Sequence, residues 1–199
     1  YMRQDKAFHP GEAVSQTIIG RLLAERFDAI VTVDPHLHRV AELEEAVPAR
    51  RSVALSAAPL IGAHFAASTP LPLLLGPDSE SEQWVKAAAG TKLDCAVCTK
   101  RRSGDHEVRI ELPPVNLRGR HVVLVDDVAS TGGTLAECAR RALAAGASRV
   151  DAAVTHALLD AGAEARLAAA GIRELVSTDT VPHASNRIGV AALLANALR

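Results

Sequence analysis

The chain has 199 residues, of which 48% are apolar and 3% aromatic, and its formal net charge is -1. This length and apolar content suffice for one ordinary domain, or two small ones, with a buried core. Near-neutral charge and scarce aromatic residues argue against a dedicated nucleic-acid-binding protein, which would carry a basic surface and stacking rings. We find no apolar run of membrane-spanning length and no opening signal peptide, so we expect neither nucleic acid nor a membrane among its partners.

The chain alternates predicted strands and helices. Apolar runs and period-two patterns predict strands at residues 29–34, 71–75, 93–99, 108–112, 121–127, 150–156 and 174–178. Helical periodicity predicts helices at residues 12–27, 52–67, 82–89, 132–145 and 161–170 and from about 190, with a charged loop or short helix at 39–50. Residues 108–112 are interpreted as part of a hairpin or flap. This alternation predicts an α/β fold with a mostly parallel sheet flanked by helices.

Three cysteines, Cys95, Cys98 and Cys138, form a small and odd set, which is typical of the reducing cytoplasm. Cys95 and Cys98 make a C-x-x-C pair, so a zinc or redox site has to be weighed. No second cysteine pair completes a zinc site, and LDCAVCT alternates like a strand, in which residues three apart point to opposite faces. We therefore interpret both as buried strand cysteines.

The stretch VVLVDDVASTGGT at residues 122–134 joins a predicted buried strand to a predicted helix. Its loop follows the carboxyl end of a parallel strand, where open α/β sheets bind ligands. Small residues there expose backbone amides next to a helix N-terminus, which favours a phosphate, and the hydroxyls of Ser130, Thr131 and Thr134 add donors. Gly132 and Gly133 allow close backbone approach.

Asp126 and Asp127, at the end of the same strand, repel a phosphate but suit a different part of one ligand. Carboxylates accept hydrogen bonds from sugar hydroxyls or bind Mg²⁺. A small sugar phosphate satisfies both halves of the motif. The alternative is an acidic, solvated strand end followed by a capped helix, and we prefer the functional interpretation because the whole string follows an apolar strand.

VVLVDDVASTGGT resembles the phosphoribosyl pyrophosphate (PRPP) loop of type I phosphoribosyltransferases and ribose-phosphate diphosphokinases. Three further stretches resemble only the diphosphokinases, namely YMRQDKAFHPGEAVS, VDPHLH and TKRRSG. They occur in that family's order, and the similarity covers nearly the whole chain. The resemblance implies transfer of diphosphate from ATP to ribose 5-phosphate, which gives PRPP and AMP. It also implies a cytoplasmic homo-oligomer that uses Mg²⁺.

The resemblance assigns a role to each matching residue. Catalytic Lys100 and Arg102 stabilise the transferring group, and His36, Asp78 and less certainly Asp34 bind metal. ATP is expected to contact Arg3, Gln4, Asp5 and His36. Ribose 5-phosphate is expected to contact Asp126, Asp127, Ser130, Thr131, Gly132, Gly133 and Thr134.

The family's synthetases carry a further stretch before the R-Q-D segment, to which nothing in this sequence corresponds. We therefore expect an incomplete N-terminal, ATP-side domain at residues 1–50 and a C-terminal PRPP-loop domain at residues 51–199, and the activity of this chain stays open. Two alternatives remain: a non-catalytic homologue that binds sugar phosphate and assembles with complete synthetases, and a salvage phosphoribosyltransferase. GPDSESEQW also departs from the S-P-D-x-G-G form, which leaves regulation by ADP and phosphate open.

Overall fold

The computed structural model describes residues 4–37, 39–103 and 107–199, and it divides into two compact units. The first unit comprises the chain up to Ser56 together with Ala191–Arg199, and the second comprises Ala57–Val190. The predicted boundary fell a few residues earlier, after residue 50. The structure also groups residues 191–199 with the first unit, whereas we expected them in the C-terminal domain.

The first unit is small and is built around two parallel strands. Strand β1 pairs with β2 from Ala29↔Arg51 to Val33↔Leu55. Its elements are helix α1 (Ser15–Ala24), strand β1 (Ala29–Val33), helix α2 (Leu43–Ala46), strand β2 (Arg51–Leu55) and helix α7 (Ala191–Ala197). Gly20 lets α1 approach the chain at the end of α2, because a Cβ there would lie 1.7 Å from the Ala46 carbonyl oxygen.

The predicted helix at residues 52–67 is wrong in its first part. Residues 51–55 form β2, and only Ala58–Phe65 form helix α3. Pairing with β1 decides the strand, because tertiary contacts override the weak local propensity of a short apolar run. The sequence did hold a sign of the later start, since Pro59 lies in the first turn of α3, where proline is favoured.

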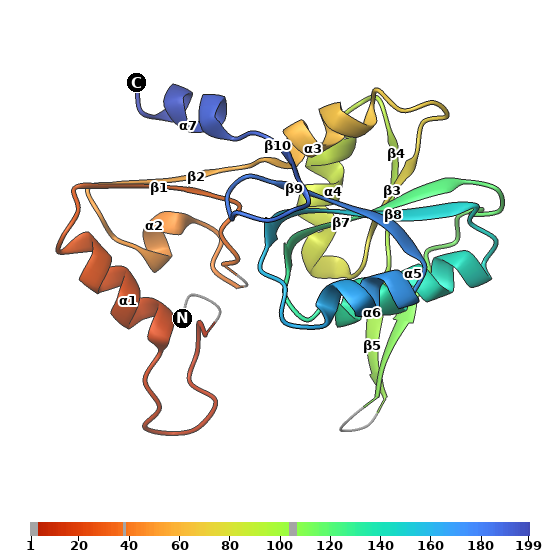
Figure 1. Ribbon diagram of the computed structural model, residues 1–199. Helices are drawn as coiled ribbons and strands as arrows, with labels where there is room; N and C mark the ends of the chain where they lie inside the picture. The colour runs from red at the N-terminus through yellow and green to blue at the C-terminus, as the bar shows by residue number, and fades with distance from the viewer. Residues whose placement is uncertain (1–3, 38, 104–106) are drawn as a thin grey trace. The chain divides into compact units, whose positions relative to one another are not determined.

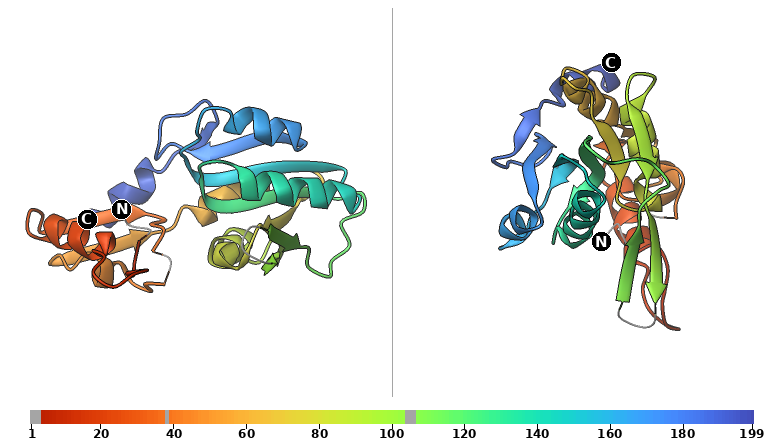
Figure 2. Two further views of the ribbon diagram at one scale, coloured as in Figure 1. Left: turned by 90° about the horizontal axis from the view of Figure 1, so that it is seen from below. Right: turned by 90° about the vertical axis from the view of Figure 1, so that its right-hand side faces the viewer.

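The second unit is a six-stranded sheet between two layers of helices, in the order β10-β9-β8-β7-β3-β4 with every pair parallel (Figures 1 and 2). Helices α3 and α4 cover one face, and α5 and α6 cover the other. The strands are β3 (Leu73–Gly76), β4 (Asp94–Val97), β7 (His121–Ala129), β8 (Arg149–Ala157), β9 (Ile172–Thr178) and β10 (Asn186–Ile188). The helices after α3 are α4 (Glu82–Ala89), α5 (Gly133–Ala144) and α6 (Ala163–Ala169), and a short turn of 3₁₀ helix spans Ser79–Ser81. The predicted, mostly parallel α/β architecture is confirmed.

Alternating residues of the central strands divide the core between the two faces. Leu73, Leu75 and Leu124 pack on the α5 and α6 side, whereas Leu74 and Val123 pack on the α3 and α4 side. All five side chains are at most 1% exposed. A strand buried on both faces reads as a continuous apolar run, which is the pattern of residues 122–125.

The order of the strands places a topological switch point between β3 and β7. From β3 the chain steps to β4 on one side, and it then crosses to β7 on the other side before continuing outward through β8, β9 and β10. Open α/β sheets bind ligands outside the carboxyl ends of the strands at such a point. The sheet therefore selects the ends of β3 and β7 as the place to look for a site.

Strands β5 (Thr99–Ser103) and β6 (Glu107–Glu111) form an antiparallel hairpin that projects away from the six-stranded sheet (Figure 1). At its base Lys100 lies opposite Ile110, which is 1% exposed. The structure confirms that residues 108–112 form part of a hairpin.

The expectation of two buried cysteines holds for Cys98 and is wrong for Cys95. Cys98 is buried, with its Sγ 3.6 Å from that of buried Cys138 on α5, and all three cysteines are free. Cys95 is exposed because it lies on β4, the last strand of the sheet order, where its face is incompletely covered.

In the part of the chain that the structure describes, we find no helix long and apolar enough to cross a membrane.

Gly62 gives a test of the helix packing in the second unit. A Cβ at this position on α3 would lie 1.8 Å from the Ala88 carbonyl oxygen of α4, so Gly62→Ala must push the two helices apart. We expect the free energy of unfolding, measured by urea denaturation, to fall by about 3 kcal/mol. Ala63→Ser, at the exposed neighbouring position, is the control and should change it by less than about 1 kcal/mol. Equal stability of wild type and Gly62→Ala would contradict the close contact.

Candidate functional site

Three neighbouring strand ends bring the predicted sugar ligands together with one predicted metal ligand, Asp78, and one predicted catalytic residue, Lys100, at one rim of the second unit. Strand β7 carries Asp126 and Asp127, Asp78 follows β3, and β4 leads through Cys98 into Lys100. Because β3 is paired with both β7 and β4, and all three strands are parallel, their carboxyl ends lie at the same edge. This rim is the candidate site.

The two aspartates of β7 are fixed by the backbone that follows them. The Asp127 amide donates to Asp126 Oδ1 at 3.1 Å, and the Val128 amide donates to Asp127 Oδ1 at 2.7 Å. Asp127 is buried, while Asp126 is partly exposed at the rim. A carboxylate can accept more than one hydrogen bond, as binding of sugar hydroxyls requires.

Negative charge accumulates at this rim, and the clearest effect is on Asp126. Burial raises the pKa of Asp126 well above its ordinary value, and the neighbouring carboxylates of Asp127 and Asp78 raise the pKa further. A perturbed carboxyl group at a strand end is typical of functional sites. A ligand that supplies hydroxyl donors or a cation would lower the free-energy cost of keeping Asp126 ionised.

The loop after β7 has the features of an anion cradle. Gly132 caps α5 in the left-handed conformation, with φ +70°, and the Gly133 amide donates to Thr131 Oγ1 at 3.3 Å. The first amides of a helix have no carbonyl partner within the helix, and the helix dipole favours negative charge at this end. Ser130, Thr131 and Thr134 surround this end with hydroxyls. The five loop residues predicted to hold a phosphate therefore lie together.

Lys100 reaches the same rim from the base of the hairpin. Its Nζ lies 3.7 Å from Asp78 Oδ2, and both side chains are partly buried, with 35% and 15% of their surface exposed. Arg102 lies further along β5, opposite Val108. The structure thus brings Lys100 to Asp78, while the catalytic roles of Lys100 and Arg102 stay predictions.

The residues predicted to bind ATP belong to the first unit, and Arg3 lies outside the described residues. The side-chain amide of Gln4 contacts the start of α1. Its nitrogen donates to the Ala13 carbonyl at 2.8 Å, and its oxygen accepts from the Ser15 backbone amide at 3.1 Å. Asp5 is 3% exposed and pairs with Arg39 at 2.6 Å. Sequence reasoning missed these structural duties, since neither Ala13 nor Arg39 is near in the chain. The ATP-binding roles stay predictions.

Asp34 and His36 follow the end of β1 in the first unit. Asp34 is 3% exposed, and its φ of +39° is uncommon for a residue with a side chain. Its amide donates to the Leu55 carbonyl at 2.8 Å, which holds this turn at the end of the two-stranded sheet. Uncommon backbone conformations cluster at ligand sites, so the turn is a suitable place for the predicted metal ligands.

The second unit offers carboxylate oxygens that suit Mg²⁺, which prefers oxygen ligands and keeps several waters. The described residues contain no cluster of three or more histidine, cysteine or acidic side chains that could hold a metal by itself. The carboxylates at the rim therefore suit a cation that is bound mainly by the phosphates of a ligand and by only one or two carboxylates of the protein. Asp78 and Asp126 fit this requirement, because the two carboxylates are near enough for Asp78 to raise the pKa of Asp126.

Sequence analysis missed one segment at the rim, the residues that follow β8. Strand β8 is the parallel neighbour of β7, so its carboxyl end lies beside the PRPP-loop residues. The Asp160 amide donates to the Ser130 carbonyl at 3.1 Å. The signal that could have revealed this segment is the adjacency of consecutive parallel strands, which a motif search does not use.

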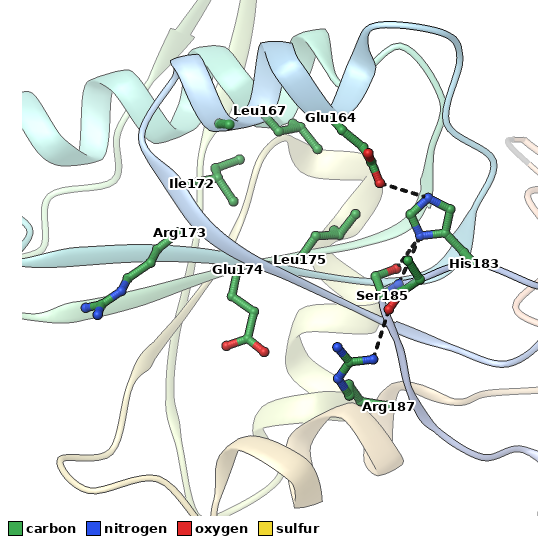
Figure 3. A pocket seen from close by; sticks show the side chains of 11 residues that line it. Glu164, Leu167, Ile172, Arg173, Glu174, Leu175, His183, Ser185 and Arg187 are labelled. Carbon is green, nitrogen blue, oxygen red and sulfur yellow. Dashed lines mark hydrogen bonds and ion pairs between the residues drawn. The ribbon is translucent and has the colours of Figure 1, made fainter.

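A cavity of about 340 Å³ lies elsewhere in the second unit, between α6 and the strands β9 and β10 (Figure 3). His183 there contacts Glu164 at 3.3 Å and Ser185 Oγ at 2.8 Å. Ser185 Oγ lies in turn 2.6 Å from Ser177 Oγ of β9, so this chain of polar groups ties β10 to the sheet. None of the predicted site residues is among the described residues that line it.

Comparisons with known proteins agree with this arrangement. The model of the phosphoribosyl transferase domain matches residues 63–191. Ribose-phosphate pyrophosphokinase 2 of Archaeoglobus fulgidus is 41% identical over 198 residues, which cover 98% of this chain and 70% of that protein. The ribose-phosphate pyrophosphokinase of Methanosarcina acetivorans is 38% identical over 201 residues, with coverages of 100% and 69%. The crystal structure of phosphoribosylpyrophosphate synthetase from Mycobacterium smegmatis has a TM-score of 0.77 at 30% identity and covers 100% of this chain and 67% of that one.

The raised pKa of Asp126 predicts a pH-dependent gain in stability for Asp126→Asn. The folded state binds this proton more tightly than the unfolded chain, so ionisation of Asp126 destabilises the fold as the pH rises above the ordinary aspartate pKa of about 4. Asparagine removes that cost and can still accept the bond from the Asp127 amide. We expect a higher melting temperature than wild type at pH 7 to 8, and a difference that shrinks toward pH 4.

Glu137→Gln is the control of opposite sign. Hydrogen bonds from Arg141 and Arg140 lower the pKa of Glu137, so its contribution to stability is present at neutral pH and is lost as the pH falls through the folded pKa. This variant should have a slightly lower melting temperature than wild type at pH 7. Its free energy of unfolding should fall by less than about 1 kcal/mol, because the group is partly exposed to solvent. A difference between Asp126→Asn and wild type that is the same at pH 4 and pH 8 would contradict the assignment.

Proposed function

Since the chain belongs to the ribose-phosphate pyrophosphokinase family, we propose that it transfers the diphosphoryl group of ATP to the anomeric hydroxyl of ribose 5-phosphate. The products are PRPP and AMP. One observation carries the proposal for this chain: the aspartate pair, the anion cradle and Lys100 lie at the same rim, on three adjacent strand ends at the switch point. This rim combines acceptors for hydroxyls, donors for a phosphate and a cation for the transferring group.

In the proposed complex the second unit holds the sugar phosphate at both ends. The amides and hydroxyls of residues 130–134 bind the 5-phosphate, where the N-terminus of α5 adds favourable partial charge. Asp126 and Asp127 accept hydrogen bonds from the ribose hydroxyls. Held in this way, the anomeric oxygen is positioned for attack, and positioning is a major part of the catalysis of phosphoryl transfer.

The transfer forms a bond from the anomeric oxygen to the β-phosphorus, breaks the bond from that phosphorus to the oxygen that AMP retains, and releases the proton of the anomeric hydroxyl to solvent. Negative charge grows on the departing oxygen and spreads over the oxygens of the transferring group. Lys100 and Arg102 of the hairpin would place positive charge there and exclude water. Mg²⁺ would supply further neutralisation. Asp78 is the proposed ligand in the second unit, and His36 and Asp34 are the proposed ligands in the first unit.

Lys100 lies beside Asp78 at the rim. Its ammonium nitrogen lies 3.7 Å from Asp78 Oδ2. Asp78 would help to hold the cation, and Lys100, beside Asp78, would place its positive charge at the transferring group.

The remaining assignments are part of the same proposal. Gln4, Asp5 and His36 of the first unit would contact ATP together with Arg3. The chain would act as a cytoplasmic homo-oligomer, and its small, odd set of three cysteines is typical of a reducing compartment.

The sugar-phosphate site predicts ligand-dependent melting. Ribose 5-phosphate near one hundred times its dissociation constant should stabilise the folded chain by about 2.7 kcal/mol, which raises the melting temperature by roughly 5–10 °C. The double variant Asp126→Asn with Asp127→Asn should lose most of this rise, because amides cannot replace two anionic acceptors. Asp94→Asn, at the amino end of β4, is the control and should retain it. An equal rise in the double variant would place the sugar elsewhere.

The catalytic proposal is tested by AMP formation from ATP, ribose 5-phosphate and Mg²⁺. Lys100→Ala should lower kcat at least about a hundredfold, because a charge aimed at the transition state is lost, while its melting shift with ribose 5-phosphate should match wild type. Lys92→Ala, which removes an exposed lysine after α4, is the charge-matched control. Wild-type protein that binds the sugar phosphate but forms no AMP would instead indicate a non-catalytic homologue.

A further inference from the structure

We propose that Arg166 of α6 is a positioning residue for the PRPP loop, which it orients by holding the carbonyl side of the loop away from the ligand. The inference rests on the proposed function and adds a residue that belongs to neither the loop nor the hairpin. Arg166 lies one turn into α6, the helix that follows β8. Its guanidinium Nη1 donates to the Thr131 carbonyl oxygen.

This contact completes a row of three. The Ala129 carbonyl accepts from the Leu158 amide at 2.9 Å, and the Ser130 carbonyl accepts from the Asp160 amide at 3.1 Å. The Thr131 carbonyl then accepts from Arg166. Three consecutive carbonyls of the loop are therefore held by one segment, residues 158–166, which we call the brace. The first two bonds continue the pairing of β7 with β8, which ends at Ala129↔Ala157.

The direction of the carbonyls fixes the direction of the amides. In a planar trans peptide the C=O of one residue and the N–H of the next point to opposite sides. Holding the carbonyls of Ala129, Ser130 and Thr131 against the brace therefore directs the next three amides, those of residues 130–132, away from it. These amides belong to the proposed phosphate cradle. The brace keeps partial negative charge off the face that binds an anion.

An arginine side chain suits the third contact because the backbone of the brace has left the loop by then. The brace turns into α6 after Gly162, so an amide is replaced by a long side chain with a permanent positive charge. Asp160 Oδ1 lies 3.7 Å from Arg166 Nη1 and helps to orient it. The next residue, Leu167, packs against Gly132, where a Cβ would lie 2.9 Å from Leu167 Cδ2. Two adjacent residues of α6 thus fix the loop just before α5 begins.

The test compares Arg166→Ala, Arg166→Lys and the control Arg173→Ala, an exposed arginine on β9. Loss of a charge-assisted hydrogen bond predicts a roughly tenfold higher KM for ribose 5-phosphate in Arg166→Ala, with kcat within about twofold of wild type. Arg166→Lys should recover most of the lost affinity, because lysine keeps a charged donor. Arg173→Ala should behave as wild type.

Hydrogen exchange of the ligand-free protein separates positioning from other roles. A positioning role predicts faster exchange of the Leu158 and Asp160 amides, which donate to the loop carbonyls, in Arg166→Ala, with other peptides and the melting temperature little changed. A raised KM with unchanged exchange of these two amides would mean that Arg166 contacts the phosphate directly, and faster exchange throughout the second unit would mean a general structural role. Either result overturns the proposal, as does an unchanged KM. Failure of wild type to bind ribose 5-phosphate would overturn the proposed function as well, and is recognised by the absence of any ligand-dependent melting shift.

Discussion

The second unit depends on keeping carboxylates at the end of a strand whose residues 122–125 are buried on both faces. Burial and the nearby carboxylates of Asp127 and Asp78 raise the pKa of Asp126, so the folded chain carries an electrostatic cost at neutral pH. The apolar run before Asp126 offsets that cost, because its side chains fill the core on both sides of the sheet. The ionised carboxylates lower the stability of the ligand-free fold, and a ligand that supplies hydrogen-bond donors or a cation would restore it. This division is typical of functional sites that are held by a rigid scaffold.

The sheet topology brings residues to the candidate site that are not part of the sequence motif at residues 122–134. A single acidic strand end is commonly a solvated turn, but β3 brings Asp78 from one side and β4 brings Lys100 from beyond it. These residues are far apart in the chain and converge because parallel strands end at one edge. The strand order reverses at β3, so this edge is the topological switch point, where open α/β sheets bind ligands. The same constraint explains why the cavity between α6 and β10 is lined by other residues, since it lies away from the switch point.

The sequence predicted most of the sheet, because buried parallel strands are apolar runs and the helices between them are periodic. Its errors occur where neighbours in space decide the structure: β2 was assigned to a helix, and β10, at residues 186–188, was missed because three residues carry no period. For the site, the loop and the aspartate pair were readable because they are contiguous. The brace was not, because two of its three contacts use backbone amides, which every residue but proline has. Gln4 and Asp5 illustrate the same limit, since their observed partners, Ala13, Ser15 and Arg39, are remote in the chain.

The proposed site must present opposite polarities to two ends of one small ligand within nine residues, from Asp126 to Thr134. In the proposed complex carboxylates would face the hydroxyl end and amides the phosphate end, so the backbone between them must turn its carbonyls away from both. Within β7 the carbonyls are bound in the sheet, since β8 pairs with β7 up to Ala129. Beyond that point the loop leaves the sheet, and an outside donor is needed for each carbonyl that would otherwise face an anion. A helix that follows the neighbouring strand is the nearest source of such a donor, which accounts for the position of Arg166 in the first turns of α6.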